Sequence, residues 1–259
     1  MPFPKLFWFF VFRQTTFLNR SRGEFIGADL MDIAILYSGG KDSTFAIDWA
    51  KKEGHFIKYL LSVKPSRKDC FLFHYATVEH SKELAKQLGI QHVLVPCDVS
   101  DPKLEAQIVK DVVVVNPVDA VVLGGTGLQE TQIRSIREAL EPLGVTVFAS
   151  HFGEDHRTVF KEMVSKGYEI VVTQVASAGL MAWLGKTISK ENFAQLEADS
   201  KKFGFHIGFE GGYADTFVCD GPIFKQKIVF GEVEKVIEDE YCGHLEVASV
   251  KLVEKVFSI

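Results

Sequence analysis

Residues 33–43 read IAILYSGGKDS, and this stretch decides the fold. Residues 33–36 are a short apolar run rich in β-branched side chains, which is typical of a strand inside a parallel sheet. A glycine pair follows as a tight turn. From Asp42 apolar residues recur at helical spacing until Gly54. The stretch therefore predicts a strand, a glycine turn and a helix.

The turn between this strand and helix carries groups that suit an anion. A helix start offers unpaired N–H groups and the positive end of the helix dipole. Gly39 and Gly40 let a ligand approach the main chain, Lys41 adds a full charge, and Ser38 and Ser43 add hydroxyl donors. An ordinary strand-to-helix turn is the alternative, but so many phosphate-suited residues around one turn argue against it.

This loop is not the common mononucleotide P-loop, whose pattern is G-x-x-x-x-G-K-[ST]. Here Gly40-Lys41 is followed by Asp42, and Ile35 stands where that pattern has its first glycine. The hexapeptide S-G-G-K-D-S instead resembles the pyrophosphate loop of the N-type ATP pyrophosphatases. The resemblance implies a loop that holds the β,γ-diphosphate of ATP while the α-phosphorus is attacked.

Composition bounds the class of protein. The chain has 259 residues, 47% of them hydrophobic, which is enough for one large α/β domain or two modest ones. A net charge of -5 argues against general nucleic-acid binding. The four cysteines show no C-x-x-C spacing, so we expect buried thiols rather than a structural zinc site. This usage fits a reducing, cytoplasmic location.

The first 30 residues differ from the rest of the chain. Residues 6–12 (LFWFFVF) are apolar, but a bilayer span needs about 20 residues, so we expect no membrane association. Met31 stands immediately before the first expected strand. We therefore interpret residues 1–30 as an N-terminal extension and expect Met31 to be the natural start.

Strands and helices alternate through residues 31–150. This alternation predicts a parallel, doubly wound α/β sheet like that of the adenine nucleotide alpha-hydrolases. Besides the opening unit, we expect strands at 56–63, 91–96, 119–123 and 145–148. We expect helices over 77–88, 101–113 and 128–140.

Residues 151–259 change character, and we interpret them as a smaller C-terminal α+β domain that binds the substrate. Helices are expected over 155–166 and 189–203. Strands are expected at 169–173, 227–230 and 245–252.

A glycine cluster follows the fourth expected strand. Residues 124–127 read GGTG, and the carboxyl ends of parallel strands are where doubly wound sheets bind ligands. Taken alone, GGTG is also ordinary turn chemistry. Beside the first glycine loop, we expect Gly125 and Thr126 to border the nucleotide. The next helix offers Gln132 as a polar candidate, although a solvated helix face explains it equally well.

A second glycine-rich stretch carries acidic residues. Glu210 stands beside Gly211 and Gly212, and Thr216 and Asp220 follow closely. Such a cluster can hold Mg²⁺, ammonium or a cationic group of a substrate. A glycine hairpin with polar turn residues explains it equally well.

The order of these motifs is more specific than any one of them. Over about residues 32–230 it resembles the diphthine–ammonia ligase family, the ATP-dependent amidases that finish diphthamide on elongation factor 2. The motifs that carry the resemblance are SGGKDS (38–43), FH (73–74), GL (179–180), WLG (183–185), EGG (210–212) and TFVCDGPIF (216–224).

The resemblance implies a reaction in which ATP, ammonium and a protein-bound carboxylate give an amide, AMP and pyrophosphate. It implies that Lys41 is the principal electrostatic group on the diphosphate and that Glu210 holds or deprotonates ammonium. Asp42 is expected to order the loop or to bind Mg²⁺. The other expected contacts are Ser38, Gly39, Gly40, Asp42, Ser43, His74, Gly125 and Thr126 for the nucleotide, and Gln132, Gly211, Gly212, Thr216 and Asp220 for the substrate.

The chain departs from the family pattern in two segments. Tyr213 replaces the glutamate that follows E-G-G in family members. In the family segment Tyr-Gln-x-x-Arg-x-Glu, only Gln132 survives, since Thr131, Ser135 and Arg137 replace the other named residues. The acceptor and the oligomeric state, a homodimer included, stay open. Two alternatives also stay open: another adenylating enzyme of this superfamily acting on tRNA or a metabolite, and a nucleotide-binding regulator without turnover.

Overall fold

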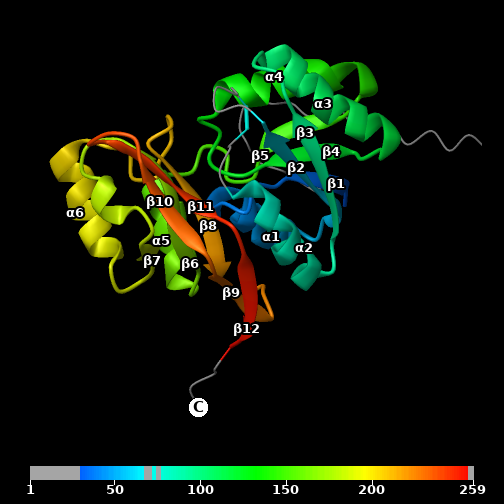
Figure 1. Cartoon of the computed structure of the whole chain (residues 1–259). Coiled ribbons are helices and arrows are strands. Elements are labelled where there is room, and N and C mark those ends of the chain that lie inside the picture. Colours follow the sequence, from blue (N-terminus) through cyan, green and yellow to red (C-terminus); the bar gives the residue numbers. More distant parts are fainter. Residues whose placement is uncertain (1–29, 67–71, 74–76, 256–259) are drawn as a thin grey trace, which may run out of the picture.

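A computed structural model of the chain describes residues 30–66, 72–73 and 77–255. The apolar run near the N-terminus and the nucleotide contact predicted for His74 lie outside these residues. The two halves of the chain form two parts that lie side by side (Figure 1).

The first part is a five-stranded parallel sheet in the order β3-β2-β1-β4-β5. The chain winds outward from β1 to β3 and then returns to the other side of β1 for β4 and β5. The strand order therefore reverses between β1 and β4, which confirms the predicted doubly wound sheet. The strands are β1 (Asp32–Leu36), β2 (Phe56–Pro65), β3 (Gln91–Cys97), β4 (Ala120–Leu123) and β5 (Thr146–Ala149).

Helices cover both faces of this sheet (Figure 1). Apolar side chains of α1 and α2 are buried against one face, and those of α3 and α4 against the other. Along β1 the side chains alternate between the two cores, as the pleat of a strand requires. The helices are α1 (Lys41–Glu53), α2 (Ser81–Leu88, after the 3-10 turn η1, Val78–His80), α3 (Pro102–Val115) and α4 (Glu130–Leu140, followed by η2, Glu141–Leu143).

The second part is built around β6 (Glu169–Ala176), the central strand of an antiparallel sheet. β8 pairs with most of β6, while β7 and β11 pair with its two ends. The elements are α5 (His156–Ser165), η3 (Met181–Trp183), β7 (Thr187–Ile188), α6 (Phe193–Phe203), β8 (Ala214–Asp220), β10 (Val233–Ile237) and β11 (Cys242–Val247). A separate two-stranded sheet joins β9 (Gln226–Phe230) to β12 (Val250–Glu254).

Among the elements that differ from the sequence-based prediction, two have a direct structural reason. The helix predicted from Ser189 begins at Phe193, because the Asn192 side chain turns back onto the preceding chain. Its amide accepts the Ser189 N–H and donates to the carbonyl oxygen of Thr187. The strand predicted over 245–252 is two strands, because β11 pairs with β10 and β6 while β12 pairs with β9.

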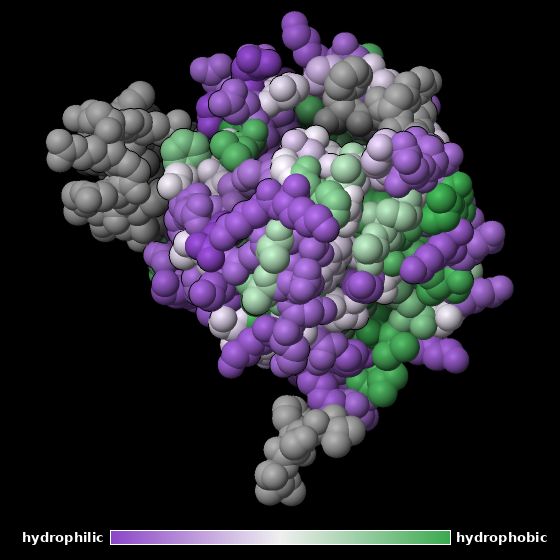
Figure 2. Space-filling view, turned by 90° about the vertical axis from the view of Figure 1, so that its left-hand side faces the viewer, coloured by the Kyte–Doolittle hydropathy of each residue, from purple (hydrophilic) through white to green (hydrophobic). Residues whose placement is uncertain are grey.

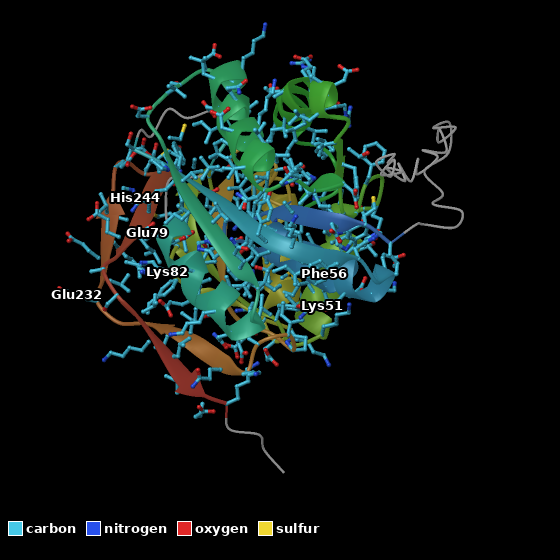
Figure 3. The ribbon with its side chains drawn as sticks, turned by 90° about the vertical axis from the view of Figure 1, so that its right-hand side faces the viewer. Lys51, Phe56, Glu79, Lys82, Glu232 and His244 are labelled. Carbon is cyan, nitrogen blue, oxygen red and sulfur yellow. The ribbon has the colours of Figure 1, made fainter. Side chains whose placement is uncertain are left out.

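The two parts share one hydrophobic core. Phe45 of α1 packs edge-on against Tyr168, which precedes β6, with 6.0 Å between the ring centroids. The two parts also meet at the His80 ring, whose Nε2 lies 2.7 Å from the carbonyl oxygen of Val247. Figure 3 shows this edge, where Glu79 and His244 are labelled, apart from Lys51 of α1 and Phe56 at the start of β2.

The face that carries α6 is mostly hydrophilic (Figure 2). α6 buries Phe193 and Leu196 and exposes Lys201 and Lys202, the pattern of a helix on the surface of a globular domain. Among the described residues, no helix is both long enough and apolar enough to cross a bilayer.

Candidate active site

The loop between β1 and α1 lies where the strand order reverses. The Ser38 hydroxyl accepts the Gly40 N–H at 3.2 Å and lies 3.3 Å from the Ser43 hydroxyl. The Ser43 hydroxyl lies 3.2 Å from the Gly40 carbonyl oxygen, to which it donates. The two serines thus hold the loop in shape and keep their hydroxyls at the start of α1, where helix N–H groups favour an anion.

Two glycines let neighbouring segments close on this loop. Gly39 has φ +80°, and a Cβ there would lie 2.6 Å from the ring of Phe217 on β8. Gly124, at the end of β4, presses against α1, because a Cβ there would lie 2.2 Å from the carbonyl carbon of Asp42. Since Cβ atoms do not approach other atoms that closely, a side chain at either position displaces the loop.

Lys41 is buried, with 4% of its surface exposed. Its ammonium group lies 2.5 Å from the Asp42 carboxylate and 5.5 and 5.7 Å from the ring centroids of Phe160 and Phe209. A buried cation needs such partners, because burying an unpaired charge is costly. The Lys41 N–H is also held, by the hydroxyl of Thr216 on β8 at 3.2 Å. The loop therefore holds the Lys41 ammonium group in a fixed place, paired with the Asp42 carboxylate.

A cavity of about 410 Å³ opens at the carboxyl ends of β1, β2 and β4. Part of its lining is apolar and comes from strand ends and the chain after β2: Leu36, Leu61, Val63, Leu72, Phe73 and Leu123. Part is polar and comes from the β1–α1 loop. A cavity that joins an apolar slot to a phosphate-suited loop fits a flat base carried on a polyanion.

The second half of the chain supplies another wall, residues 208–216. Phe209 there adopts φ +63°, a strained conformation for a residue with a side chain. Its ring packs against Phe160 and Phe205, with ring centroids 5.9 and 6.2 Å apart, and these contacts hold the turn. Glu210 follows at the wall of the cavity, half-buried.

The cavity brings together most of the residues that the sequence singled out. The Gln132 amide donates to the carbonyl oxygen of Leu72, so this side chain forms part of the wall. The predicted residues that line the cavity are Ser38, Gly40, Lys41, Asp42, Ser43, Gln132, Glu210, Gly211, Gly212 and Thr216.

Asp220 lies elsewhere. Its carboxylate pairs with the Lys255 ammonium at 2.5 Å. The reason is the geometry of β8: four residues along a strand cover about 13 Å, so Thr216 and Asp220 of one motif end far apart. Gly39 also lies outside the lining and shapes the loop from beneath, against Phe217.

The GGTG turn meets the cavity through Gly124 rather than through Gly125 and Thr126. Gly125 packs against the Gln129 side chain. The Thr126 hydroxyl contacts Nε2 of His156 in a second, neighbouring cavity. Neither Gly125 nor Thr126 lines the larger cavity, so their predicted place beside the nucleotide stays a prediction.

His156 was not singled out by the sequence. It is the first residue of α5, after the helix cap Asp155, whose carboxylate accepts the Thr158 N–H at 2.8 Å. Burial lowers the pKa of His156 to about 4, and burial also lowers the pKa of His206, whose ring lies edge-on 4.8 Å away. Both rings are therefore neutral at pH 7. The sequence shows only a single histidine after a helix-capping aspartate, and this pattern does not reveal that the ring is buried.

The thiols follow the prediction where they are described. Cys97 and Cys219 are buried and Cys242 is half-buried, and none of these three described cysteines is in a disulfide. Burial raises the pKa of the Cys219 thiol to about 12, which makes it a poor nucleophile. Within the described ranges no group of three His, Cys, Asp or Glu side chains could hold a metal ion by itself.

A phosphate-suited loop at the switch point of a doubly wound sheet, next to an apolar slot, defines a nucleotide-binding α/β protein. Matches between this chain and family models identify its family within this class. The model described as the diphthamide synthase N-terminal domain matches residues 31–147, and the model of the C-terminal domain matches residues 155–253. Together these matches cover most of the chain, which belongs to the diphthamide synthase family.

Curated relatives carry a ligase name. The chain is 27% identical to a diphthine–ammonia ligase of Rattus norvegicus over 88% of this chain and 95% of the relative. It is 29% identical to that of Danio rerio over 81% and 90%, and 26% identical to that of Homo sapiens over 88% and 95%. A solved structure, a predicted subunit of a tRNA methyltransferase from Methanocaldococcus jannaschii, matches 74% of this chain and 98% of its own with 15% identity and a TM-score of 0.40.

Proposed function

We propose that the chain is a diphthine–ammonia ligase, which uses ATP to form a C–N bond on elongation factor 2. The reaction adenylates the carboxylate of diphthine, lets ammonia displace AMP, and releases pyrophosphate. The observation that carries the proposal is the shared cavity: the SGGKDS loop and the EGG turn come from different halves of the chain and line one space. Membership of the diphthamide synthase family supports the same activity.

The β1–α1 loop suits the pyrophosphate that leaves. A free carboxylate is a poor acyl donor, because hydroxide-like oxygen leaves badly, whereas AMP leaves well. Lys41 and the N–H groups at the start of α1 supply positive charge and donors in a fixed arrangement, with the Ser38 and Ser43 hydroxyls beside them. Such preorganised donors stabilise the charge that develops on the diphosphate as the α–β bond breaks.

The residues of this loop fit Mg²⁺ that would bind together with the phosphates of a nucleotide. Mg²⁺ commonly takes one or two carboxylates and completes its shell with phosphate oxygens and water, so a site made of protein side chains alone is not required. Asp42 lines the cavity and is the carboxylate that would hold the ion. When bound, Mg²⁺ would neutralise phosphate charge.

We assign the acceptor carboxylate and ammonium to the wall of residues 208–216, with Gln132 beside it. In this proposal residues 31–150 bind the nucleotide and residues 151–259 bind the substrate. With elongation factor 2 as its protein substrate, we expect the enzyme to be cytoplasmic.

The departures from the family pattern leave most of the cavity intact. Thr131 lines it, but Ser135 is buried within α4, and the Arg137 guanidinium donates to the carbonyl oxygen of Val147 at 3.2 Å. Tyr213 replaces a family glutamate, yet Asp215 lines the cavity and keeps a carboxylate there. These placements favour an active enzyme over a nucleotide-binding regulator without turnover.

Product analysis tests the proposal. We expect ATP, ammonium and elongation factor 2 carrying diphthine to give AMP, pyrophosphate and the amide, with no AMP when the acceptor is omitted. ADP and phosphate as products would contradict the assignment to this superfamily. ATP binding without turnover on that acceptor would favour the regulator, and turnover only with tRNA or a metabolite would favour another adenylating enzyme.

A further inference from the structure

A second cavity, of about 280 Å³, adjoins the first. Leu128 lines both. The two cavities also meet at a pair of side chains, because His156 lines the second and Glu210 lines the first, with His156 Nδ1 and Glu210 Oε1 3.8 Å apart. A ligand in the second cavity is therefore separated from the first by this pair.

The His156 ring is fixed at this boundary. It is 8% exposed, its Nε2 contacts the Thr126 hydroxyl, and a Cβ on Gly208 would lie 2.6 Å from its Nδ1. Glu210 is fixed too, because its Oε1 accepts the Gln129 amide N–H at 2.8 Å. Each side chain of the pair is thus held in place by its own contacts, and the two face each other across the boundary.

Two buried polar atoms beside this pair lack a hydrogen-bond partner among the described residues: Gln129 Oε1 and His206 Nδ1. Gln129 Oε1 is an acceptor, and His206 Nδ1 accepts in one tautomer of its neutral ring. Unsatisfied buried acceptors are costly, so they point to a ligand that donates: His206 on the side of the second cavity, Gln129 on the side of the first.

The charges around the second cavity favour a small cation. Glu154 and Asp155 line it, and the Arg157 guanidinium that also lines it is paired with Glu197. Because His156 and His206 are neutral at pH 7, they do not repel a cation. Ammonium combines a positive charge with four N–H donors, and its size is close to that of water, about 30 Å³, so the second cavity is an ample vestibule for it.

We propose that the second cavity is the entrance for ammonium and that His156 and Glu210 take up its protons at the boundary. This inference rests on the proposed function and deepens it. Once a nucleotide and an acceptor occupy the first cavity, the nitrogen donor needs a separate way to the acyl carbon.

The proton steps balance as follows. His156, which lines the second cavity, takes one proton from ammonium and leaves ammonia. The ammonia lone pair forms the C–N bond to the acyl carbon, while the C–O bond to AMP breaks and its electron pair leaves on AMP. The nitrogen then loses a second proton to the Glu210 carboxylate, which lines the first cavity, and both protons return to water through the second cavity.

The test separates adenylation from the ammonium step in the wild-type enzyme and three variants. ATP–pyrophosphate exchange, measured with acceptor and without ammonium, reports adenylation. Amide formation at varied ammonium concentration reports the second step. Hydroxylamine is used as an alternative nucleophile, because it is mostly uncharged near neutral pH and needs no deprotonation before it attacks. The variants are His156→Gln, Ile207→Trp, which fills the second cavity, and the control His244→Ala, a buried histidine outside both cavities.

We expect His156→Gln to raise the KM for ammonium about tenfold or more, with exchange changed less than about twofold and hydroxylamine turnover kept. We expect Ile207→Trp to raise the KM for both nucleophiles, since it blocks the way in. Wild-type ammonium KM in both variants, or a parallel loss of exchange in both, would overturn the entrance. A wild-type enzyme that shows neither exchange nor amide formation would instead remove the proposed function, and the inference with it.

Discussion

The two walls of the central cavity are built in different ways. The β1–α1 loop is one continuous segment, and its serines bond to each other and to Gly40 within it. The wall of residues 208–216 is held from outside, by rings that pack on Phe209 and by the Gln129 amide on Glu210. The first wall is therefore held mostly by bonds within its own segment, with Thr216 of β8 as an added support, and the second wall by tertiary packing. Tyr213, a departure from the family pattern, falls in the second.

The largest expected effect comes from the first wall. Lys41→Ala removes its fixed charge, and we expect kcat/KM for AMP formation to fall about 10²- to 10³-fold, or about 3–4 kcal/mol. Lys202→Ala is the matched control, because the Lys202 ammonium lies over Phe203 on exposed α6. Circular dichroism checks that the fold persists. Wild-type rates in Lys41→Ala would break the assignment of the first wall to phosphate charge.

The second expected effect concerns how tightly β4 closes on the loop. In Gly124→Ala the new Cβ meets the backbone of Asp42, so we expect a loss of about 3 kcal/mol in the free energy of unfolding. Gly144→Ala is the control, since its Cβ meets nothing within 4 Å and only the strain of φ +70° remains, about 1 kcal/mol. Urea unfolding measures both, and equal losses would contradict the close contact.

The third effect comes from His156, which contacts the second wall. The pKa of His156 is about 4 when folded, against 6.5 ordinarily, so the unfolded chain binds more protons between these values. Stability therefore falls as pH drops through this window, and His156 contributes up to about 2 kcal/mol of the loss at pH 5. Lys41, Asp42, Asp155 and His206 also act on this ring.

We expect His156→Gln to lose less stability than the wild type between pH 7 and pH 5, by up to that amount. Urea unfolding at the two pH values measures the difference. Parallel losses in the two proteins would show that the folded ring titrates as it does in water.

The smallest expected effect comes from Asp220, which lies on β8 beyond the second wall. Asp220→Asn weakens the half-buried pair with Lys255, and we expect a stability loss under about 1 kcal/mol. We expect kcat/KM to stay within about twofold of the wild type, because Asp220 does not line the cavity. A large rise in KM for the acceptor would return Asp220 to the substrate site.

The fold of the first half could be predicted because its signals are local. The β-branched run, the glycine pair and the helical period of residues 33–54 each act within a few residues, and the same pattern recurs along the chain. β8 could not be predicted in this way, because its half-polar sequence becomes a strand by pairing with β6.

The candidate site divides in the same way. Lys41 could be identified from a contiguous motif, but its contact with Thr216 exists only because β8 packs on the loop. Thr216 and Asp220 share one motif, yet the rise along a strand separates them. His156 is functional in our proposal only through its burial beside Glu210, which no spacing in the sequence encodes.

The central claim is that the β1–α1 loop holds the two outer phosphates and leaves the inner one open to the acceptor carboxylate. Isotope transfer tests it most directly: the acceptor carboxylate is labelled with ¹⁸O and the AMP is analysed by mass spectrometry. We predict one labelled oxygen in each AMP formed, because the carboxylate oxygen attacks the α-phosphorus and leaves with AMP. Unlabelled AMP, or label in inorganic phosphate with ADP as the other product, would contradict the account.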